Sequence, residues 1–231
     1  MRISQQSGIK CIFCTSVTAE DNVAGPDSAA RRRGVAHLKH CVDIVAEFGG
    51  NVLSGLPYAP WGFKTGMPRT RDEELWSQES VREVCQYAQQ SNILIAIEPV
   101  NRFECYFLAT AAEAIQYCSE VGEPNIGVHL DTFQMNIEEK DIAGAIRRTG
   151  NRLYHFHMCA SDRGVPGEDH ILWSDVFAAL KDIGYDRWIT VESFSPEPGG
   201  PGATAAIWRR LAPSSDAIAE GALKVFRKYL G

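Results

Sequence analysis

Ile93-Leu-Ile-Ala-Ile-Glu98 is an apolar run that ends on a side chain able to bind a divalent cation, and three later runs share this form. They are Ile126-Gly-Val-His-Leu-Asp131, Leu153-Tyr-His-Phe-His157 and Trp188-Ile-Thr-Val-Glu192. Helical patterns separate these runs, and strands that alternate with helices predict one parallel sheet. Because parallel strands finish at the same edge, we expect Glu98, Asp131, His157 and Glu192 to converge. Three carboxylates and an imidazole at the carboxyl end of a parallel barrel predict an oxygen-rich metal site.

The composition predicts a single globular domain over residues 1–231. Of the 231 residues, 45% are hydrophobic, which is enough for one sizeable core. The net charge of −6 and the pI near 5.5 argue against nucleic acid or an anionic membrane surface as a partner. The sequence has no signal peptide pattern and no apolar run near the roughly 20 residues of a membrane span. We therefore expect a cytoplasmic protein with no membrane partner.

The seven cysteines are scattered along the chain, which fits a reducing compartment. Cys11 and Cys14 form a Cys-x-x-Cys pattern, but they lie inside a strand pattern and no second pair completes a zinc site. We interpret them as strand residues without a metal or redox function. The basic triplet Arg31-Arg32-Arg33 begins an amphipathic helix and is interpreted as a solvated face.

The pattern contains six βα units. Further strands are expected at residues 8–15 and 51–56, followed by a long loop at 57–70, and helices at 28–48, 72–90, 110–121, 142–149, 173–183 and 203–230, the last broken near Pro213. A closed (β/α)8 TIM barrel needs eight units. The predicted fold class is therefore α/β, a TIM barrel that lacks its first two βα units, roughly 60 residues. Its two open edges would need a partner chain, a rearrangement or a longer gene product to cover them.

The two glutamates of the predicted site suggest proton-transfer chemistry. Glu98 and Glu192 lie on non-adjacent strands, so they could bind one cation and approach a ligand from opposite sides. One carboxylate could then remove a proton from a carbon while the other returns a proton to the opposite face. A metal that chelates a carbonyl and a neighbouring hydroxyl stabilises the enediolate between these steps. This predicts isomerisation or epimerisation of a hydroxy-carbonyl compound such as a sugar.

Four motifs carry a resemblance to a known family. They are Ile97-Glu-Pro-Val-Asn-Arg-Phe-Glu104, Leu130-Asp-Thr-Phe-Gln-Met-Asn-Ile-Glu138, His155-Phe-His157 with Arg163, and Val191-Glu-Ser-Phe194. In order and spacing they resemble the ketose 3-epimerases, which include D-tagatose, D-allulose (psicose) and L-ribulose 3-epimerases and belong to the xylose isomerase-like TIM barrels. The resemblance runs from about Gly8 to the end. It implies a metal-dependent isomerase that inverts C3 of a free ketose of the D-tagatose, D-fructose/D-psicose or L-ribulose type.

The same resemblance implies roles for individual residues. Mn²⁺ or Co²⁺, with Mg²⁺ as an alternative, would be held by Glu98, Asp131, His157 and Glu192, and the catalytic acid and base would be Glu98 and Glu192. Substrate oxygens would be bound by Glu104 and Arg163, and an apolar wall would be formed by Leu56, Trp61, Cys14 and Phe194. Where the family has a histidine three residues after its metal-binding aspartate, this chain has Gln134, which can hydrogen-bond but carries no charge. The implied partners are a small-molecule ketose and further copies of the chain, in a homodimer or homotetramer.

Alternatives stay open for several residues and for the function. Arg163 could form a loop salt bridge, Glu104 could be solvated, and Trp61 could pack an oligomer interface. His129 and His155 each precede a predicted ligand by two residues and face the same way, so we interpret them as core histidines or supports of the ligands. The alternative functions are a truncated, catalytically silent sugar-binding relative, and another sugar isomerase or an inosose dehydratase of the same barrel.

Overall fold

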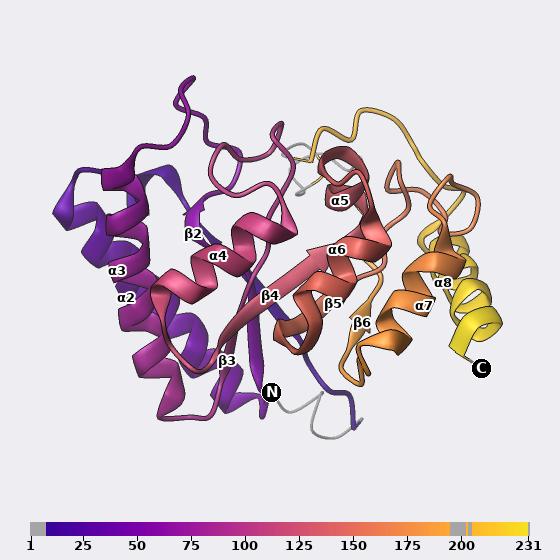
Figure 1. Ribbon diagram of the computed structural model, residues 1–231, viewed down its shortest axis with the longest axis horizontal. Coiled ribbons are helices and arrows are strands. Elements are labelled where there is room, and N and C mark those ends of the chain that lie inside the picture. Colours follow the sequence, from indigo (N-terminus) through magenta and orange to yellow (C-terminus); the bar gives the residue numbers. More distant parts are fainter. Residues whose placement is uncertain (1–7, 195–201, 203–204, 231) are drawn as a thin grey trace.

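The computed structural model describes residues 8–194, 202 and 205–230. In this part of the chain, six parallel strands form one sheet in the order β1-β2-β3-β4-β5-β6, so each strand pairs with its neighbours in the sequence (Figure 1). The strands are β1 (Phe13–Val17), β2 (Val52–Pro60), β3 (Leu94–Ile97), β4 (Ile126–Asp131), β5 (Leu153–His157) and β6 (Ile189–Thr190). A helix follows each strand, which confirms the predicted α/β barrel class with six βα units.

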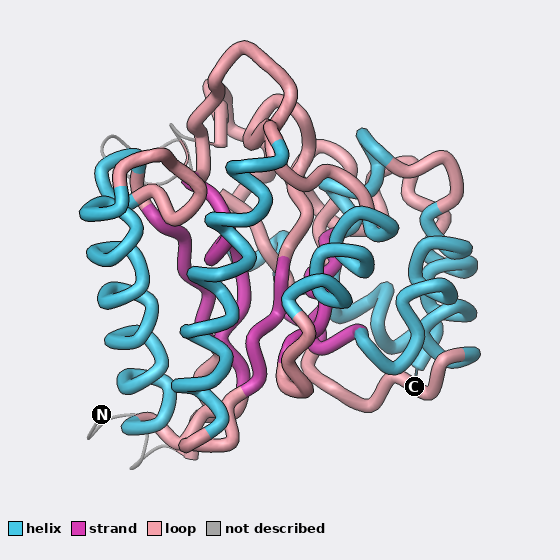
Figure 2. Tube along the Cα trace, turned by 60° about the vertical axis from the view of Figure 1, so that its left-hand side comes forward, coloured by secondary structure: helices cyan, strands magenta, loops and turns pink. Residues whose placement is uncertain are grey.

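Helices connect the strands and cover one face of the sheet (Figure 2). They are α2 (Ser28–Glu47), α3 (Arg71–Gln89), α4 (Ala111–Val121), α5 (Thr132–Glu138), α6 (Ile142–Thr149), α7 (Trp173–Asp182) and α8 (Ser215–Leu230), with 3-10 turns η1 (Ala19–Asp21) and η2 (Gly150–Arg152). Helices α3 and α4 both begin with a capping box, in which the side chains of Thr70 and Thr110 accept from the backbone of Glu73 and Glu113. Within the described residues, no helix has the length and apolar character needed to span a bilayer.

The sheet is curved into a trough with a polar concave face. Cys14 Sγ on β1 lies 3.9 Å from His157 Nε2 on β5, although three strands separate them in the sheet. Along β4, Val128 and Leu130 belong to the hydrophobic core, whereas the alternate residues His129 and Asp131 are buried polar groups. This alternation follows from the two-residue period of a strand, and it places ionisable side chains together inside the trough.

Gly55 allows β1 to lie close against β2. Its φ is +112°, and a Cβ at this position would collide with the backbone carbonyl oxygen of Thr15. The register of the pair shifts just after this contact, so that Val17 pairs with Pro60. This local geometry fixes the strand that carries Cys14.

Several boundaries differ from the sequence predictions. Strand β1 begins at Phe13 and not at residue 8, because pairing with β2 begins only there, and β2 continues through Pro60, into the predicted loop. Helix α5 was not predicted. Only two residues of the run that ends at Glu192 are strand, so this side chain lies just beyond β6. Residues 205–214 are not helical and α8 begins at Ser215, whereas the prediction began a helix at 203.

Candidate active site and metal centre

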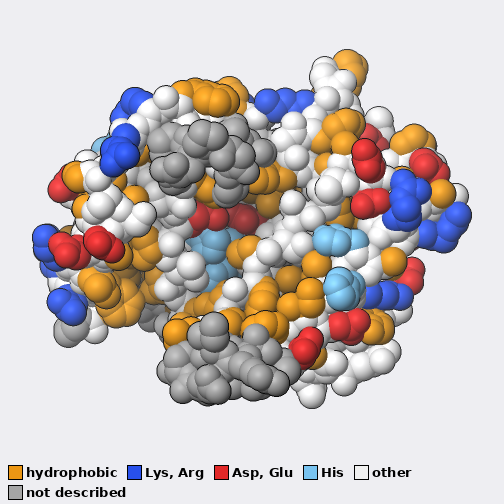
Figure 3. Space-filling model, turned by 180° about the vertical axis from the view of Figure 1, so that it is seen from behind, with side chains coloured by type: hydrophobic (Ala, Val, Ile, Leu, Met, Phe, Trp, Pro, Cys, Tyr) orange, Lys and Arg blue, Asp and Glu red, His pale blue; other side chains and the backbone are white. Residues whose placement is uncertain are grey.

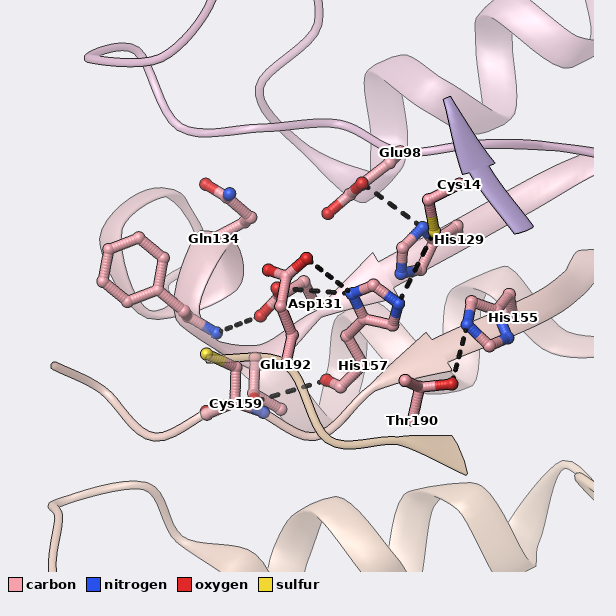
Figure 4. A network of polar contacts seen from close by, with 12 residues as sticks. Cys14, Glu98, His129, Asp131, Gln134, His155, His157, Cys159, Thr190 and Glu192 are labelled. Atoms are coloured by element: carbon pink, nitrogen blue, oxygen red, sulfur yellow. Dashed lines mark hydrogen bonds and ion pairs between the residues drawn. The ribbon is translucent and has the colours of Figure 1, made fainter. Parts of the chain in front are cut away.

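The four predicted ligands lie at the carboxyl ends of four consecutive strands. Asp131 is the last residue of β4 and His157 is the last residue of β5. Glu98 directly follows β3, and Glu192 follows β6 by two residues. Because the strands are parallel, their ends bring these side chains to one edge of the trough, where Figure 4 shows them directed toward one another.

Two overlapping groups of potential ligands result. Ligand atoms of Glu98, Asp131 and His157 all lie within 4.8 Å of one another, and the same holds for Asp131, Cys159 and Glu192. His157 Nδ1 links the groups, since it lies 3.8 Å from Asp131 Oδ2 and 3.5 Å from Glu192 Oε1. The structure therefore brings together the four residues that the sequence analysis selected.

Two buried atoms in this cluster indicate that it suits a cation. Asp131 Oδ2 and His157 Nδ1 are buried and have no hydrogen-bond partner, while Asp131 Oδ1 accepts from the backbone N–H of Phe133 at 2.7 Å. Unpartnered buried polar atoms are costly, and a metal ion would supply the missing contact. A donor set of three carboxylates and one imidazole fits a hard divalent cation such as Mn²⁺ or Mg²⁺.

The electrostatics of the cluster point in the same direction. Burial, and then the Glu192 carboxylate, raise the pKa of Glu98 well above its usual range. Burial and the Asp131 carboxylate raise the pKa of Glu192 to about 7. Burial opposes charge on Asp131 as well, but the nearby His157 ring and the Arg163 guanidinium outweigh it and lower the Asp131 pKa. The carboxylates thus repel one another, and a divalent cation between them would relieve that repulsion.

Arg163 closes one side of the site. Its Nη1 donates to Glu192 Oε2 at 2.6 Å and its Nη2 donates to Glu104 Oε1 at 3.2 Å. The guanidinium lies between the rings of Phe133 and Phe194, at 4.0 and 4.7 Å from their centroids, and the residue is only 1% exposed. Arg163 thus forms an ion pair, as the salt-bridge alternative expected. However, the pair is buried within the site, and its partner is the predicted catalytic residue Glu192.

Glu104 is buried and is the centre of a hydrogen-bond network. Its Oε2 accepts from Trp61 Nε1 at 2.9 Å and from Gln134 Nε2 at 3.2 Å. Its Oε1 accepts from Asn101 Nδ2 at 3.1 Å and from Arg163 Nη2 at 3.2 Å. Each carboxylate oxygen therefore has two donors, which excludes the solvated-loop alternative. The network fixes Trp61, Gln134 and Arg163 relative to one another, so Glu104 positions these residues whether or not it also contacts substrate.

Gln134 is held firmly although it replaces a histidine of the family pattern. It lies in α5, is 2% exposed, and its Oε1 accepts from the backbone N–H of Asn101 at 2.8 Å. Sequence analysis missed Asn101. Its position three residues before Glu104, in the loop after a ligand-bearing strand, is the signal that could have found it.

Two residues of the predicted apolar wall lie side by side. The rings of Trp61 and Phe194 are stacked with centroids 6.4 Å apart, near the Glu104 network. Leu56 is buried and belongs to the hydrophobic core cluster. Cys14 is exposed, and its Sγ lies 2.8 Å from Ser54 Oγ, so its contacts are polar as well as apolar.

His129 and His155 lie next to residues of the proposed ligand cluster or of the neighbouring strand β6. His129 Nδ1 lies 3.4 Å from Glu98 Oε2, and His155 Nε2 lies 3.2 Å from Thr190 Oγ1. Burial lowers the pKa of His129 well below its usual value and that of His155 to about 3, so both rings are neutral. Seen from the open side, acidic and histidine side chains lie at the bottom of a hollow (Figure 3).

Comparison with known proteins gives a consistent result. The sequence pattern described as "xylose isomerase-like TIM barrel" matches residues 2–228. The chain is 35% identical over 224 residues to a probable ketose 3-epimerase of Synechocystis sp., covering 97% of this chain and 78% of that one. It is 33% identical to an L-ribulose 3-epimerase of Methylomonas sp., covering 97% of this chain and 79% of the relative.

Solved structures show the same likeness. A D-allulose 3-epimerase from Methylomonas sp., in complex with D-allulose, superimposes with a TM-score of 0.94 at 31% identity, covering 99% of this chain and 80% of that chain. A D-psicose 3-epimerase from Clostridium cellulolyticum with D-tagatose superimposes with a TM-score of 0.91 at 30% identity, covering 99% and 81% of the two chains.

Proposed function

Because this chain belongs to the ketose 3-epimerases of the xylose isomerase-like TIM barrel family, which are isomerases, we propose that it inverts C3 of a free ketose by proton transfer between Glu98 and Glu192. The main support is the placement of these two glutamates at one edge of the sheet, after the non-adjacent strands β3 and β6, with Asp131 and His157 between them. A ketose in the trough would then have one carboxyl group toward each face of C3.

Glu98, Asp131, His157 and Glu192 are the residues that would hold a divalent cation, which we propose is Mn²⁺, with Co²⁺ or Mg²⁺ as alternatives. When bound, the cation supplies positive charge that stabilises the oxygen atoms of the substrate as the C3 proton leaves. The two unpartnered buried atoms, Asp131 Oδ2 and His157 Nδ1, support this assignment.

The protein's own groups suit the proposed proton transfers. A carboxyl with a pKa near neutrality is an effective general base and acid, and the pKa of Glu192 is raised to about 7 by burial and by Asp131. Arg163 donates to Glu192 Oε2, which orients one oxygen and leaves the other for the substrate. One glutamate would remove the C3 proton to give a cis-enediolate, and the other would protonate the opposite face. In the reverse direction their roles exchange.

We propose that the substrate is a ketose of the D-psicose, D-fructose, D-tagatose or L-ribulose type, since relatives named for such sugars match most of this chain. Arg163, which donates to Glu192 Oε2, would lie beside the bound sugar. Gln134, held by Asn101 and Glu104, would offer a neutral contact, and the stacked rings of Trp61 and Phe194 would cover an apolar part of the sugar.

A panel of ketoses tests the proposal. The protein is loaded with Mn²⁺, Co²⁺ or Mg²⁺ and incubated with D-fructose, D-psicose, D-tagatose and L-ribulose in D2O, and products are followed by NMR. We expect inversion at C3 together with deuterium at C3. Glu98→Gln and Glu192→Gln should each lower kcat by about 10²- to 10⁴-fold. Glu47 is an exposed glutamate on α2, so Glu47→Gln is the matched control and should leave kcat unchanged. Full metal occupancy with no product from any ketose would refute the proposal and favour a silent sugar-binding relative.

The proposal includes a homodimer or homotetramer. Strands β1 and β6 are the edges of the described sheet, and open edges favour association. Analytical ultracentrifugation decides this, since a monodisperse monomer at micromolar concentration would contradict it. The cytoplasmic location stays a prediction.

A further inference from the structure

A second cluster of metal-binding atoms lies on the other side of His157. Cys14 Sγ, a ring nitrogen of His129 and a ring nitrogen of His157 all lie within 4.8 Å of one another. The Cys14 sulfur is 3.9 Å from His157 Nε2, whereas Nδ1 of the same ring faces Asp131 and Glu192. Figure 4 shows Cys14 and His129 on the side of the His157 ring away from these carboxylates. Nδ1 of this imidazole thus faces carboxylate oxygens, whereas its Nε2 faces a sulfur.

His129 has unused hydrogen-bonding capacity in this cluster. It is fully buried, and neither ring nitrogen has a hydrogen-bond partner. Leaving such a group unpaired is costly, so a buried unpaired imidazole needs an explanation. Nδ1 lies 3.4 Å from Glu98 Oε2, outside hydrogen-bond geometry, and one of the two ring nitrogens lies within 4.8 Å of ligand atoms of Cys14 and His157.

The third group is an accessible thiol at a suitable distance. Cys14 is exposed, and the contact to Ser54 Oγ at 2.8 Å fixes its sulfur. In tetrahedral zinc sites the bond lengths to sulfur and nitrogen place these ligand atoms about 3.5 Å apart. The observed 3.9 Å between Cys14 Sγ and His157 Nε2 therefore needs an adjustment of only about 0.4 Å.

We propose that Cys14, His129 and His157 form a site for a thiophilic divalent cation such as Zn²⁺ or Cd²⁺, separate from the oxygen-rich site. On binding, the S–H bond of Cys14 breaks, the extra proton of the His157 ring also leaves, and both protons pass to solvent. The thiolate and two neutral imidazole nitrogens then coordinate the cation. Soft thiolate and imidazole ligands select such cations, whereas carboxylates select Mn²⁺ or Mg²⁺.

The two sites exclude each other because they share His157. A neutral imidazole has one nitrogen lone pair to donate. His157 can therefore bind only one cation at a time, through either Nδ1 or Nε2. A thiophilic cation bound at Cys14 therefore removes a ligand from the oxygen-rich site. That this also stops epimerisation rests on the proposed function, whereas the binding itself does not.

Cadmium absorbance tests the site directly. Metal-free full-length protein is titrated with Cd²⁺ while the ultraviolet thiolate-to-cadmium charge-transfer band is recorded. We expect the wild type to saturate at one thiolate-bound cadmium per chain. Cys14→Ser should show no such band even at about 100 times the Cd²⁺ concentration that saturates the wild type. Cys41→Ser is the matched control, because Cys41 also has a histidine nitrogen nearby, His37 Nε2 at 3.7 Å, but belongs to no three-ligand group among the described residues. A band that persists in Cys14→Ser, or is absent from wild type, would overturn the proposal.

Thiol alkylation gives a second test that uses only the wild-type protein. We expect Zn²⁺ to protect Cys14 from iodoacetamide while Cys41 stays reactive, and Mn²⁺ to leave both thiols reactive, as measured by peptide mass spectrometry. Equal protection of both thiols by Zn²⁺, or none, would refute the proposed site. Activity is measured on separate samples that hold Mn²⁺ and no Cd²⁺. If the protein shows the cadmium band but its Mn²⁺-loaded form has no epimerase activity, only the proposed function is refuted, and if the Mn²⁺-loaded form is active but no cadmium band appears, only this site is refuted.

Discussion

Removing the charge of Glu104 should destabilise the protein far more than the same change in a surface ion pair. Glu104→Gln keeps the shape of the side chain, but its amide nitrogen must face either Trp61 and Gln134 or Asn101 and Arg163, which are all donors. At least two donors then lose their acceptor, and the buried Arg163 loses an ionic partner at 3.2 Å. Breaking a buried pair in this way costs about 3–5 kcal/mol.

The magnitude can be checked by thermal and urea unfolding. For a chain of this size, a loss of 3–5 kcal/mol lowers Tm by about 6–20 °C. The matched control is Glu83→Gln, whose carboxylate pairs with Lys39 Nζ at 2.7 Å but is 59% exposed, so that its loss should cost less than about 1 kcal/mol. If Glu104→Gln unfolds no earlier than Glu83→Gln, the network is not a determinant of stability and the reasoning fails.

Three further outcomes are expected. Chelation of the bound metal should lower Tm, because a cation at 100 times its Kd stabilises the folded state by about 2.7 kcal/mol, and re-addition of Mn²⁺ should restore it. In chelator-treated protein the free energy of unfolding should fall as pH rises above about 7, because the raised pKa values of Glu98, Glu192 (about 7) and His157 mean that the folded state retains protons the unfolded chain has released. At lower pH the lowered pKa values of His129 and His155 oppose this trend, so urea midpoints that rise above pH 7 are the result that would contradict the assignment. Gly55→Ala should cost more than about 1 kcal/mol in urea unfolding, because its Cβ meets the Thr15 carbonyl, whereas Gly49→Ala, also at positive φ but with open space, should cost less; equal losses would refute the close-approach argument.

The sequence predicted the ligand cluster because a simple rule connects it to the fold. In parallel strands, residues at the carboxyl ends meet, so strand ends at Glu98, Asp131 and His157 suffice to infer a common site. Glu192 reached the site by the same argument even though its strand is only two residues long. The rule tolerates this error, because a side chain just past a strand still lies at the same edge.

Other features depend on contacts that no local pattern contains. Asn101 donates to Gln134 of α5, and Glu104 accepts from Trp61 just after β2 and from Arg163 in the loop after β5. These partners are distant in the sequence, so the residues around Asn101 and Glu104 could not identify the network. Helix α5 is short, and Asp131, which looks like a strand end, also serves as its N-cap. The start of β1 was placed too early because alternation alone does not tell where a partner strand begins.

The proposed ligands lie at the ends of β3, β4, β5 and β6, one in each successive unit of the chain. A cation that binds all four can therefore be held only after the last of these strands has docked, both during synthesis and during refolding. Binding of the metal would then show that all four of these units have folded. Loss of the ion on heating or in denaturant, before global unfolding, would show that the least stable of these units has opened.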